Sequence, residues 1–140
     1  MEISVLKRKS KPMRSFDKTE WKYYDREHFG RVISWDTRIY YLKAYEGKEI
    51  VGTMELKVEA GVGFIKTLIV KYSNQRKGTG KILMLEAENI IKKQNGHKIF
   101  LTTGKYWDAV KFYLALGFKQ TGEMRNHYFH VNFIEMSKFI

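Results

Sequence analysis

The spacing of hydrophobic positions divides the chain into segments with the period of a strand and segments with the period of a helix. From Arg38 onward, apolar and aromatic residues recur at every second position, which places them on one face of a strand. Gly47 and Gly61 interrupt this pattern, so we expect turns there and an antiparallel meander of three strands. Along the whole chain, strands are predicted at residues 3–6, 38–46, 50–59, 64–72, 98–102, 118–121 and 128–139.

Helical periodicity appears between these strands. Leu83, Ala87 and Ile91 are spaced so that they share one helical face, which predicts a helix over residues 80–95. Asn95 and Gly96 would end this helix, because residues of these two types readily adopt the left-handed conformation that closes a helix. A further short helix is predicted at residues 107–116, before Gly117.

An earlier helix is predicted from a capping pattern. Asp17 and Glu20 have the spacing of a capping box, so we expect a helix over residues 17–29. The resulting order, β-α-βββ-α-β-α-ββ, indicates an α/β (α+β) fold with a mixed, largely antiparallel central sheet and helices on both faces. We expect one domain spanning residues 1–140.

Composition narrows the class of protein. Aromatic residues make up 15% of the chain, which is too much apolar surface for a disordered basic tail. The absence of cysteine excludes a disulfide scaffold and a catalytic thiol, and we expect no metal site. No apolar run approaches the length of a membrane span, and the N-terminal charges follow the apolar residues, the reverse of a signal peptide. We therefore expect a cytoplasmic globular protein with no membrane partner.

The charge balance indicates an anionic partner without naming it. Lys and Arg number 26 against 15 Asp and Glu, a net charge of +11 with neutral histidines. Nucleic acid, a membrane surface or a phosphorylated cofactor would each be attracted by such a chain.

One strand–loop–helix segment, residues 68–81, has the features of an anion site. A helix N-terminus presents unpaired N–H groups and a partial positive charge, and Gly78 and Gly80 let the backbone approach a phosphate closely. Arg76 and Lys77 add full positive charges beside these glycines. A doubly phosphorylated ligand would suit this loop.

Two common phosphate-binding motifs do not fit this segment. A P-loop would need glycine at Gln75 and Ser or Thr after Lys81, where Ile82 stands. A dinucleotide fingerprint starting at Gly78 would lack its third glycine. The pattern that does fit is Gln-x-x-Gly-x-Gly, five residues after the valine that ends the strand.

This pattern resembles motif A of the GNAT superfamily, the acetyl-CoA-dependent N-acetyltransferases. Residues 109–118 (AVKFYLALGF) resemble motif B of the same family, at about the expected separation. The resemblance implies that acetyl-CoA is the acyl donor and that backbone amides of the loop hold its pyrophosphate. The donor-binding residues that it implies are Leu68, Ile69, Val70, Gln75, Arg76, Lys77, Gly78, Thr79, Gly80, Lys81, Tyr106, Ala109 and Phe112.

The resemblance also implies a mechanism, in which a neutral amine attacks the thioester directly. Tyr113 is the implied general acid, because a phenol of pKa about 10 can protonate a leaving thiolate whose acid has a pKa of about 8.5. A bulge in the strand before the loop would free backbone N–H groups at residues 68–70. Tyr106 stands where the family often has Asn, and Val62 lies in the region of its catalytic Glu, so the base is unassigned.

Several further questions stay open at this point. The candidates for the base are Glu55, Glu59, Glu123 and His127. The acceptor is an amine, either a small molecule or a protein amine, and the protein is a monomer or a homodimer.

Two alternatives from other classes remain. One is a GNAT-like domain that binds acyl-CoA without catalysis. The other is a nucleic-acid-binding module, because residues 61–64 (GVGF) resemble part of an RNA-binding signature. That match is poor, since Ala60 and Val62 replace the expected basic and aromatic residues, so nucleic acid is disfavoured as a partner.

Overall fold

The computed structural model describes residues 1–140, which form two compact units, residues 1–35 and residues 36–140. The first unit contains one helix, α1 (Lys11–Phe29). Ser10 caps its N-terminus, with Oγ accepting a hydrogen bond from the Met13 N–H at 3.4 Å. Pro12 lies in the first turn, where a missing N–H leaves no helical hydrogen bond unmade. At the other end, Gly30 adopts a φ of 71° and closes the helix.

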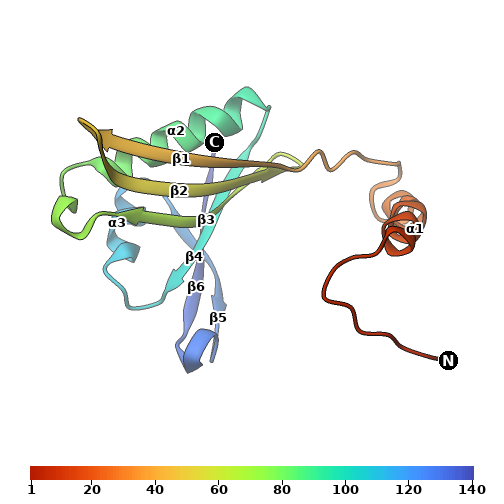
Figure 1. The fold of residues 1–140 in the computed structure, drawn as a ribbon. Helices are drawn as coiled ribbons and strands as arrows, with labels where there is room; N and C mark the ends of the chain where they lie inside the picture. Colours follow the sequence, from red (N-terminus) through yellow and green to blue (C-terminus); the bar gives the residue numbers. More distant parts are fainter. The chain divides into compact units, whose positions relative to one another are not determined.

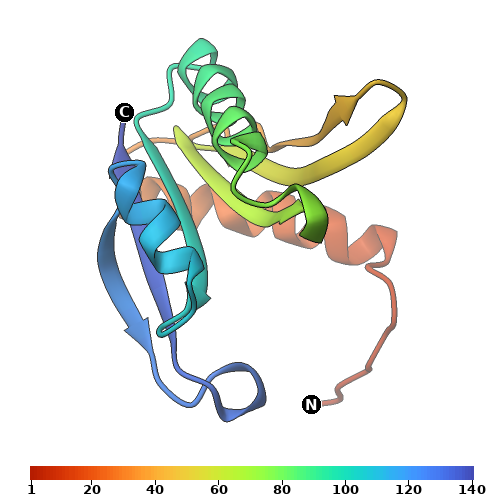
Figure 2. The same cartoon turned by 90° about the vertical axis from the view of Figure 1, so that its left-hand side faces the viewer.

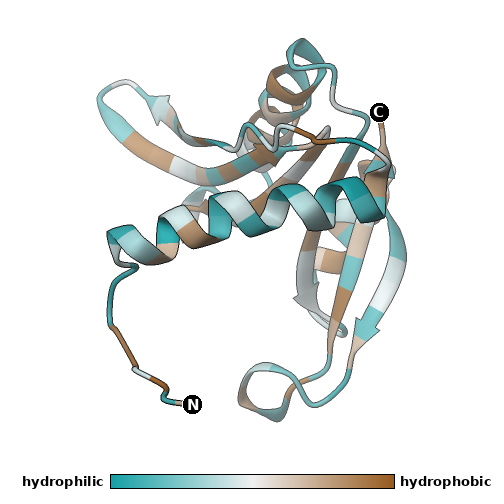
Figure 3. Cartoon of the chain, turned by 90° about the vertical axis from the view of Figure 1, so that its right-hand side faces the viewer, coloured by the Kyte–Doolittle hydropathy of each residue, from teal (hydrophilic) through white to brown (hydrophobic).

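Two predictions for this unit are wrong. Residues 3–6 form no strand, because no other strand pairs with their N–H and C=O groups. Asp17 does not begin α1, because Ser10 and Pro12 together start the helix earlier, and Asp17 instead forms an ion pair with Lys9. Figure 3 shows α1 as a mostly hydrophilic helix interrupted by hydrophobic bands.

The second unit is a mixed sheet with two helices, drawn in Figure 1. Its strands and helices are β1 (Arg38–Glu46), β2 (Glu49–Glu59), β3 (Val62–Val70), α2 (Thr79–Lys93), β4 (Lys98–Gly104), α3 (Ala109–Ala115), β5 (Lys119–Met124) and β6 (Phe133–Phe139). The strand order is β1-β2-β3-β4-β6-β5, and every neighbouring pair is antiparallel except β3 and β4. The predicted meander of three strands and the largely antiparallel sheet are therefore confirmed.

Both helices of this unit pack on the same face of the sheet, as Figure 2 shows. Leu83 of α2, Tyr113 of α3 and Ile99 of β4 belong to one buried cluster. The burial of such apolar side chains is the main favourable contribution to folding. Within residues 36–140, helices therefore cover one face of the sheet rather than both.

A turn and close packing explain the two glycines within residues 61–64. Gly61 adopts a φ of 81° in the turn between β2 and β3. Gly63 lies against α2, where a Cβ would come within 2.2 Å of the Ile91 Cδ1. Phe64 stacks on Phe100 of β4, with ring centroids 4.8 Å apart. The sheet itself thus accounts for this run of residues.

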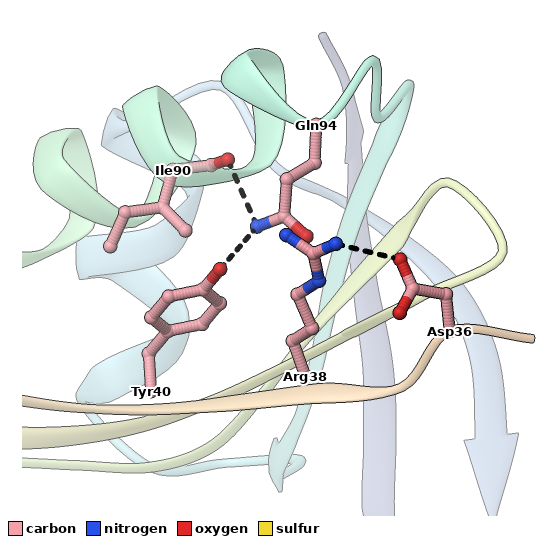
Figure 4. Close-up of polar contacts among 5 residues, drawn as sticks. All are labelled: Asp36, Arg38, Tyr40, Ile90 and Gln94. Carbon is pink, nitrogen blue, oxygen red and sulfur yellow. Dashed lines mark hydrogen bonds and ion pairs between the residues drawn. The ribbon is translucent and has the colours of Figure 1, made fainter.

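Polar side chains tie the edge strand β1 to the end of α2 (Figure 4). The Gln94 side-chain nitrogen donates to the Tyr40 hydroxyl at 2.9 Å and to the Ile90 carbonyl at 3.4 Å. Nearby, Arg38 donates to the Asp36 carboxylate at 2.9 Å. The Gln94–Tyr40 hydrogen bond thus links the edge strand to the C-terminal end of the helix whose N-terminus carries the candidate anion site.

The last strand begins later than predicted, at Phe133. A short 3-10 turn, η2 (Tyr128–His130), precedes it and contains Phe129 at a φ of 53°. The Asn126 N–H donates to the Asn132 side-chain oxygen at 2.8 Å across this loop. The aromatic run therefore belongs partly to a tight loop, because backbone at positive φ cannot continue a strand. No helix of the protein has the length and apolar character needed to cross a membrane.

Candidate active site

Strands β3 and β4 diverge in the middle of the sheet. Their parallel ladder joins only residues 62–64 to residues 98–100, although β3 continues to Val70 and β4 to Gly104. Beyond this ladder, the main-chain N–H and C=O groups of β3 that face β4 have no strand partner. The divergence thus exposes hydrogen-bonding groups inside a sheet, where they are normally paired.

A bulge accompanies this divergence. Lys66 is an extra residue in the ladder between β2 and β3, between the paired residues Ile65 and Thr67. Such a bulge bends a strand and increases its twist. The expected bulge is therefore present, and it precedes residues 68–70, around which the free N–H groups are predicted.

A groove of about 660 Å³ opens between the end of β3, the loop that follows it and α3. A short 3-10 turn, η1 (Tyr72–Asn74), starts the loop. The groove is lined by Leu68, Val70, Asn74, Gln75, Arg76, Gly78, Thr79, Gly80, Lys81, Asp108, Ala109, Lys111, Phe112 and Tyr113.

One end of the groove is suited to an anion. Gly78 caps α2 with a φ of 88° and has no side chain to occupy the first N–H groups of the helix. Arg76, Lys81 and Lys111 line the groove, and none of them forms an ion pair. Asp108 is the only acidic residue in the lining. The helix N-terminus and these cations together favour a ligand with several negative charges.

The glycine at the start of α2 also fixes how closely the two sides of the groove approach. A Cβ on Gly80 would lie 3.1 Å from the Phe112 Cζ. Glycine at this position therefore lets α2 and α3 sit close together, while the main chain of the loop stays accessible. The donor set, with free main-chain N–H groups and uncompensated cations, fits a diphosphate group such as that of coenzyme A.

The other end of the groove is apolar and contains Tyr113. This side chain is 8% exposed and packs against Phe112 and Phe118, at centroid distances of 5.1 and 5.7 Å. Burial raises the pKa of Tyr113 to about 12, and no charged neighbour offsets this effect. The phenol therefore keeps its proton at any physiological pH. Its pKa exceeds that of a typical thiol by about 3.5, so full proton transfer from Tyr113 to a thiolate is less favourable than an ordinary phenol pKa near 10 implied, and a hydrogen bond from the neutral phenol is the easier role.

The family comparison decides the family of the chain. A model of the acetyltransferase (GNAT) domain matches residues 9–140. The chain belongs to the GNAT acetyltransferase family. No match was found among curated proteins.

Solved GNAT structures share this fold. The chain is 16% identical to a protein from Agrobacterium tumefaciens assigned as an acetyltransferase, with a TM-score of 0.75 over 100% of both chains. An acetyltransferase from Bacillus cereus is 18% identical, with a TM-score of 0.75 over 98% of both chains. A Bacillus anthracis protein, assigned as a streptothricin acetyltransferase and solved with acetyl coenzyme A, is 24% identical with a TM-score of 0.68. That alignment covers 73% of this chain and 62% of the other.

Most of the residues that the GNAT motifs pointed to lie on the groove. Three do not line it: Ile69, Lys77 and Tyr106. Ile69 alternates with Leu68 and Val70 along β3, so its side chain points away from them and is 64% exposed. Tyr106 is 84% exposed, and no side-chain amide takes the place of the family's Asn at this position.

Three residues of the groove lining were not predicted. Asp108 precedes Phe112 by four residues, so helical spacing could have placed it on the same face. Lys111 lies within motif B and could have been included with the other cations. Asn74 carries no sequence signal, because its burial depends on how the loop packs.

None of the four candidate bases lines the groove. Hydrogen bonds from Lys57 and Thr37 lower the pKa of Glu59, and one from Lys105 lowers the pKa of Glu123. These two carboxylates are therefore weaker bases than ordinary ones.

The other two candidates are also engaged elsewhere. Glu55 pairs with Lys66 at 3.0 Å. His127 packs against the rings of Tyr128 and Phe133. The groove thus contains a proton donor, Tyr113, and one carboxylate, Asp108, but none of the four predicted bases.

Proposed function

We propose that the protein is an N-acetyltransferase that transfers the acetyl group of acetyl-CoA to an amine by direct attack. The observation that carries the proposal is a single groove lined both by the start of α2 and by the buried residue Tyr113. Such a groove matches a donor with phosphates at one end and a thioester at the other. Family membership supports the same reaction class.

Each part of the groove has a distinct task in this proposal. The main-chain N–H groups at Gly78–Gly80, with Arg76 and Lys81, hold the diphosphate. The free N–H groups of β3 at residues 68–70 bind the carbonyl oxygen, where negative charge develops during attack. When bound, acetyl-CoA supplies the electrophilic thioester carbon.

Proton transfer completes the proposed reaction. The amine nitrogen bonds to the carbonyl carbon, the carbon–sulfur bond breaks, and the nitrogen loses its extra proton to water. Tyr113 donates a hydrogen bond or its proton to the departing sulfur, and a phenolate formed in this way regains a proton from water. Because none of the four predicted bases lines the groove, water is the proposed acceptor of the amine proton.

Thiol release in the presence of amines tests this proposal. The purified protein is incubated with acetyl-CoA and a panel of amines: peptide N-termini, lysine peptides, amino sugars and small amines. Thiol release is corrected for hydrolysis without amine. We expect at least one amine to accelerate thiol release and to yield its acetylated product, identified by mass spectrometry.

A second candidate function is binding of acyl-CoA without catalysis. It is favoured by the absence of the four predicted bases from the groove and by Tyr106 at the family's Asn position. Stabilisation by acetyl-CoA in a thermal shift assay, without amine-dependent thiol release from any amine, would support this candidate. A ligand at 100 times its Kd stabilises a protein by about 2.7 kcal/mol, so the shift is measurable. Stabilisation by an oligonucleotide instead would favour a nucleic-acid-binding role.

A further inference from the structure

Asn74 is a buried polar residue on the groove to which neither sequence motif assigns a task. It is the last residue of η1, and its side chain lines the groove although the residue is only 7% exposed. The Asn74 main-chain N–H donates to the Lys71 carbonyl at 2.8 Å, so the backbone of this residue is fixed. The side chain therefore emerges from a fixed position in the loop.

The side-chain amide of Asn74 is not fully used within the protein. Its oxygen accepts one long hydrogen bond, from the Ser73 hydroxyl at 3.4 Å, and its nitrogen donates to no protein group. Every fully enclosed side-chain nitrogen or oxygen of the protein has a partner. The Asn74 nitrogen thus keeps a solvent-accessible position, and the groove is the space that the residue lines.

The neighbourhood of Asn74 indicates which ligand group it meets. Gln75 and Arg76 follow it directly, and the free N-terminus of α2 lies on the same groove. A side-chain N–H directed into such a positively charged space is complementary to an anionic oxygen. An amide can donate there, whereas the isosteric carboxylate of aspartate would repel the same group.

We infer that the Asn74 side-chain amide donates a hydrogen bond to the diphosphate of the acyl donor, beside the main-chain N–H groups of α2. This inference rests on the proposed function, because it names a further contact to the same donor. Asn74 is then a donor-binding residue and takes no part in the chemical step.

Calorimetric titration with coenzyme A tests the inference. In Asn74→Asp we expect the Kd for coenzyme A to rise at least tenfold, because a donor is lost and a like charge is introduced. The matched control is Asn89→Asp, which makes the same charge change on an exposed part of α2 that does not line the groove. We expect the Kd of this control to stay within about twofold of the wild-type value.

Acetylated pantetheine, which lacks the diphosphate, locates the contact. We expect Asn74→Asp to leave the KM for this truncated donor unchanged while raising the KM for acetyl-CoA. If the KM for both donors rises equally, the amide contacts the pantetheine arm and the diphosphate assignment is overturned. Asn74→Ala, which adds no charge, serves if Asn74→Asp does not fold, and we expect its Kd to rise several-fold.

The outcomes separate the inference from the proposed function. Unchanged coenzyme A affinity in both Asn74 variants would overturn the inference and leave the proposed function standing. Failure of the unsubstituted protein to bind coenzyme A would overturn the proposed function, and the inference with it.

Discussion

The two ends of the groove are built by different means. At the end near α2, the main chain supplies the hydrogen-bond donors. Gly78, at a φ of 88°, leaves the first N–H groups of the helix free, and the cations beside them are exposed. At the end near α3, one buried side chain supplies the proton donor. Tyr113 packs against aromatic rings, and its burial raises its pKa to about 12.

Because of this difference, we expect binding of the acyl donor and the chemical step to depend on different groups. Main-chain donors persist when side chains change, so binding of the acyl donor is expected to be sensitive to backbone conformation and only weakly sensitive to the loss of a single exposed charge. A buried phenol has no substitute, so turnover is expected to depend on one hydroxyl. Substitutions at the two ends should therefore affect different kinetic quantities.

Removal of the Tyr113 hydroxyl is expected to have the largest effect. Tyr113→Phe keeps the packing against Phe112 and Phe118 and should lower kcat by about 10²–10⁴, as for loss of a general acid. The Kd for coenzyme A, measured by titration calorimetry, should stay nearly unchanged. An unaltered kcat would show that Tyr113 takes no part in the mechanism, and the proposed division of tasks between the two ends of the groove would then be wrong.

The alkaline stability of the fold provides the next test. The folded-state pKa of Tyr113 is raised by burial from its usual value near 10 to about 12. Its contribution is therefore fully present below pH 10 and is lost as the pH rises from about 10 to about 12, by about 2–3 kcal/mol. Denaturant unfolding of the wild type and Tyr113→Phe across this range should show the greater loss in the wild type. Equal losses would indicate that the phenol is not buried as described.

A change in backbone conformation at the other end should affect binding instead. Gly78→Ala places a side chain at a φ of 88°, which costs about 1–2 kcal/mol, so we expect the Kd for coenzyme A to rise about 5- to 30-fold. Gly47→Ala is the matched control, since Gly47 also has a positive φ and open space around it but lies in the β1–β2 turn. The control should lose stability without losing affinity. A similar loss of affinity in both variants would show that the loop conformation has no special role.

Removal of a single charge is expected to have the smallest effect. Arg76→Gln should raise the Kd for coenzyme A only about two- to fivefold, because exposed charges interact weakly through water. The effect should diminish at high salt, where the charges are screened. Lys48→Gln, in the β1–β2 turn, makes the same charge change away from the groove. A loss much larger than fivefold in Arg76→Gln would mean that side chains, rather than the main chain, dominate donor binding.

Much of the fold could be predicted because its signals are local. The period of two from Arg38 and the turns at Gly47 and Gly61 depend only on neighbouring residues, and the β1–β2–β3 meander forms as expected. The strand expected at residues 3–6 failed for the opposite reason. A strand exists only when another strand pairs with it, and no property of a short apolar run ensures such a partner.

The candidate site divides in the same way. The glycines and cations of the loop were visible in the sequence because anion binding at a helix N-terminus requires those residue types at close spacing. The sequence did not show that Asn74 lines the groove, nor that the four predicted bases lie elsewhere. Whether a polar side chain faces a groove or an ion-pair partner depends on residues far away in the chain.

The sequence by itself determined the family, the order of strands and helices within residues 36–140, and the candidate anion-binding loop, since each follows from short-range spacing. Only the tertiary structure decided where β3 parts from β4, how far burial raises the pKa of Tyr113, and which side chains reach the groove. The physical reason is that strand pairing, desolvation and enclosure are properties of packed surfaces, which arise from contacts between distant parts of the chain.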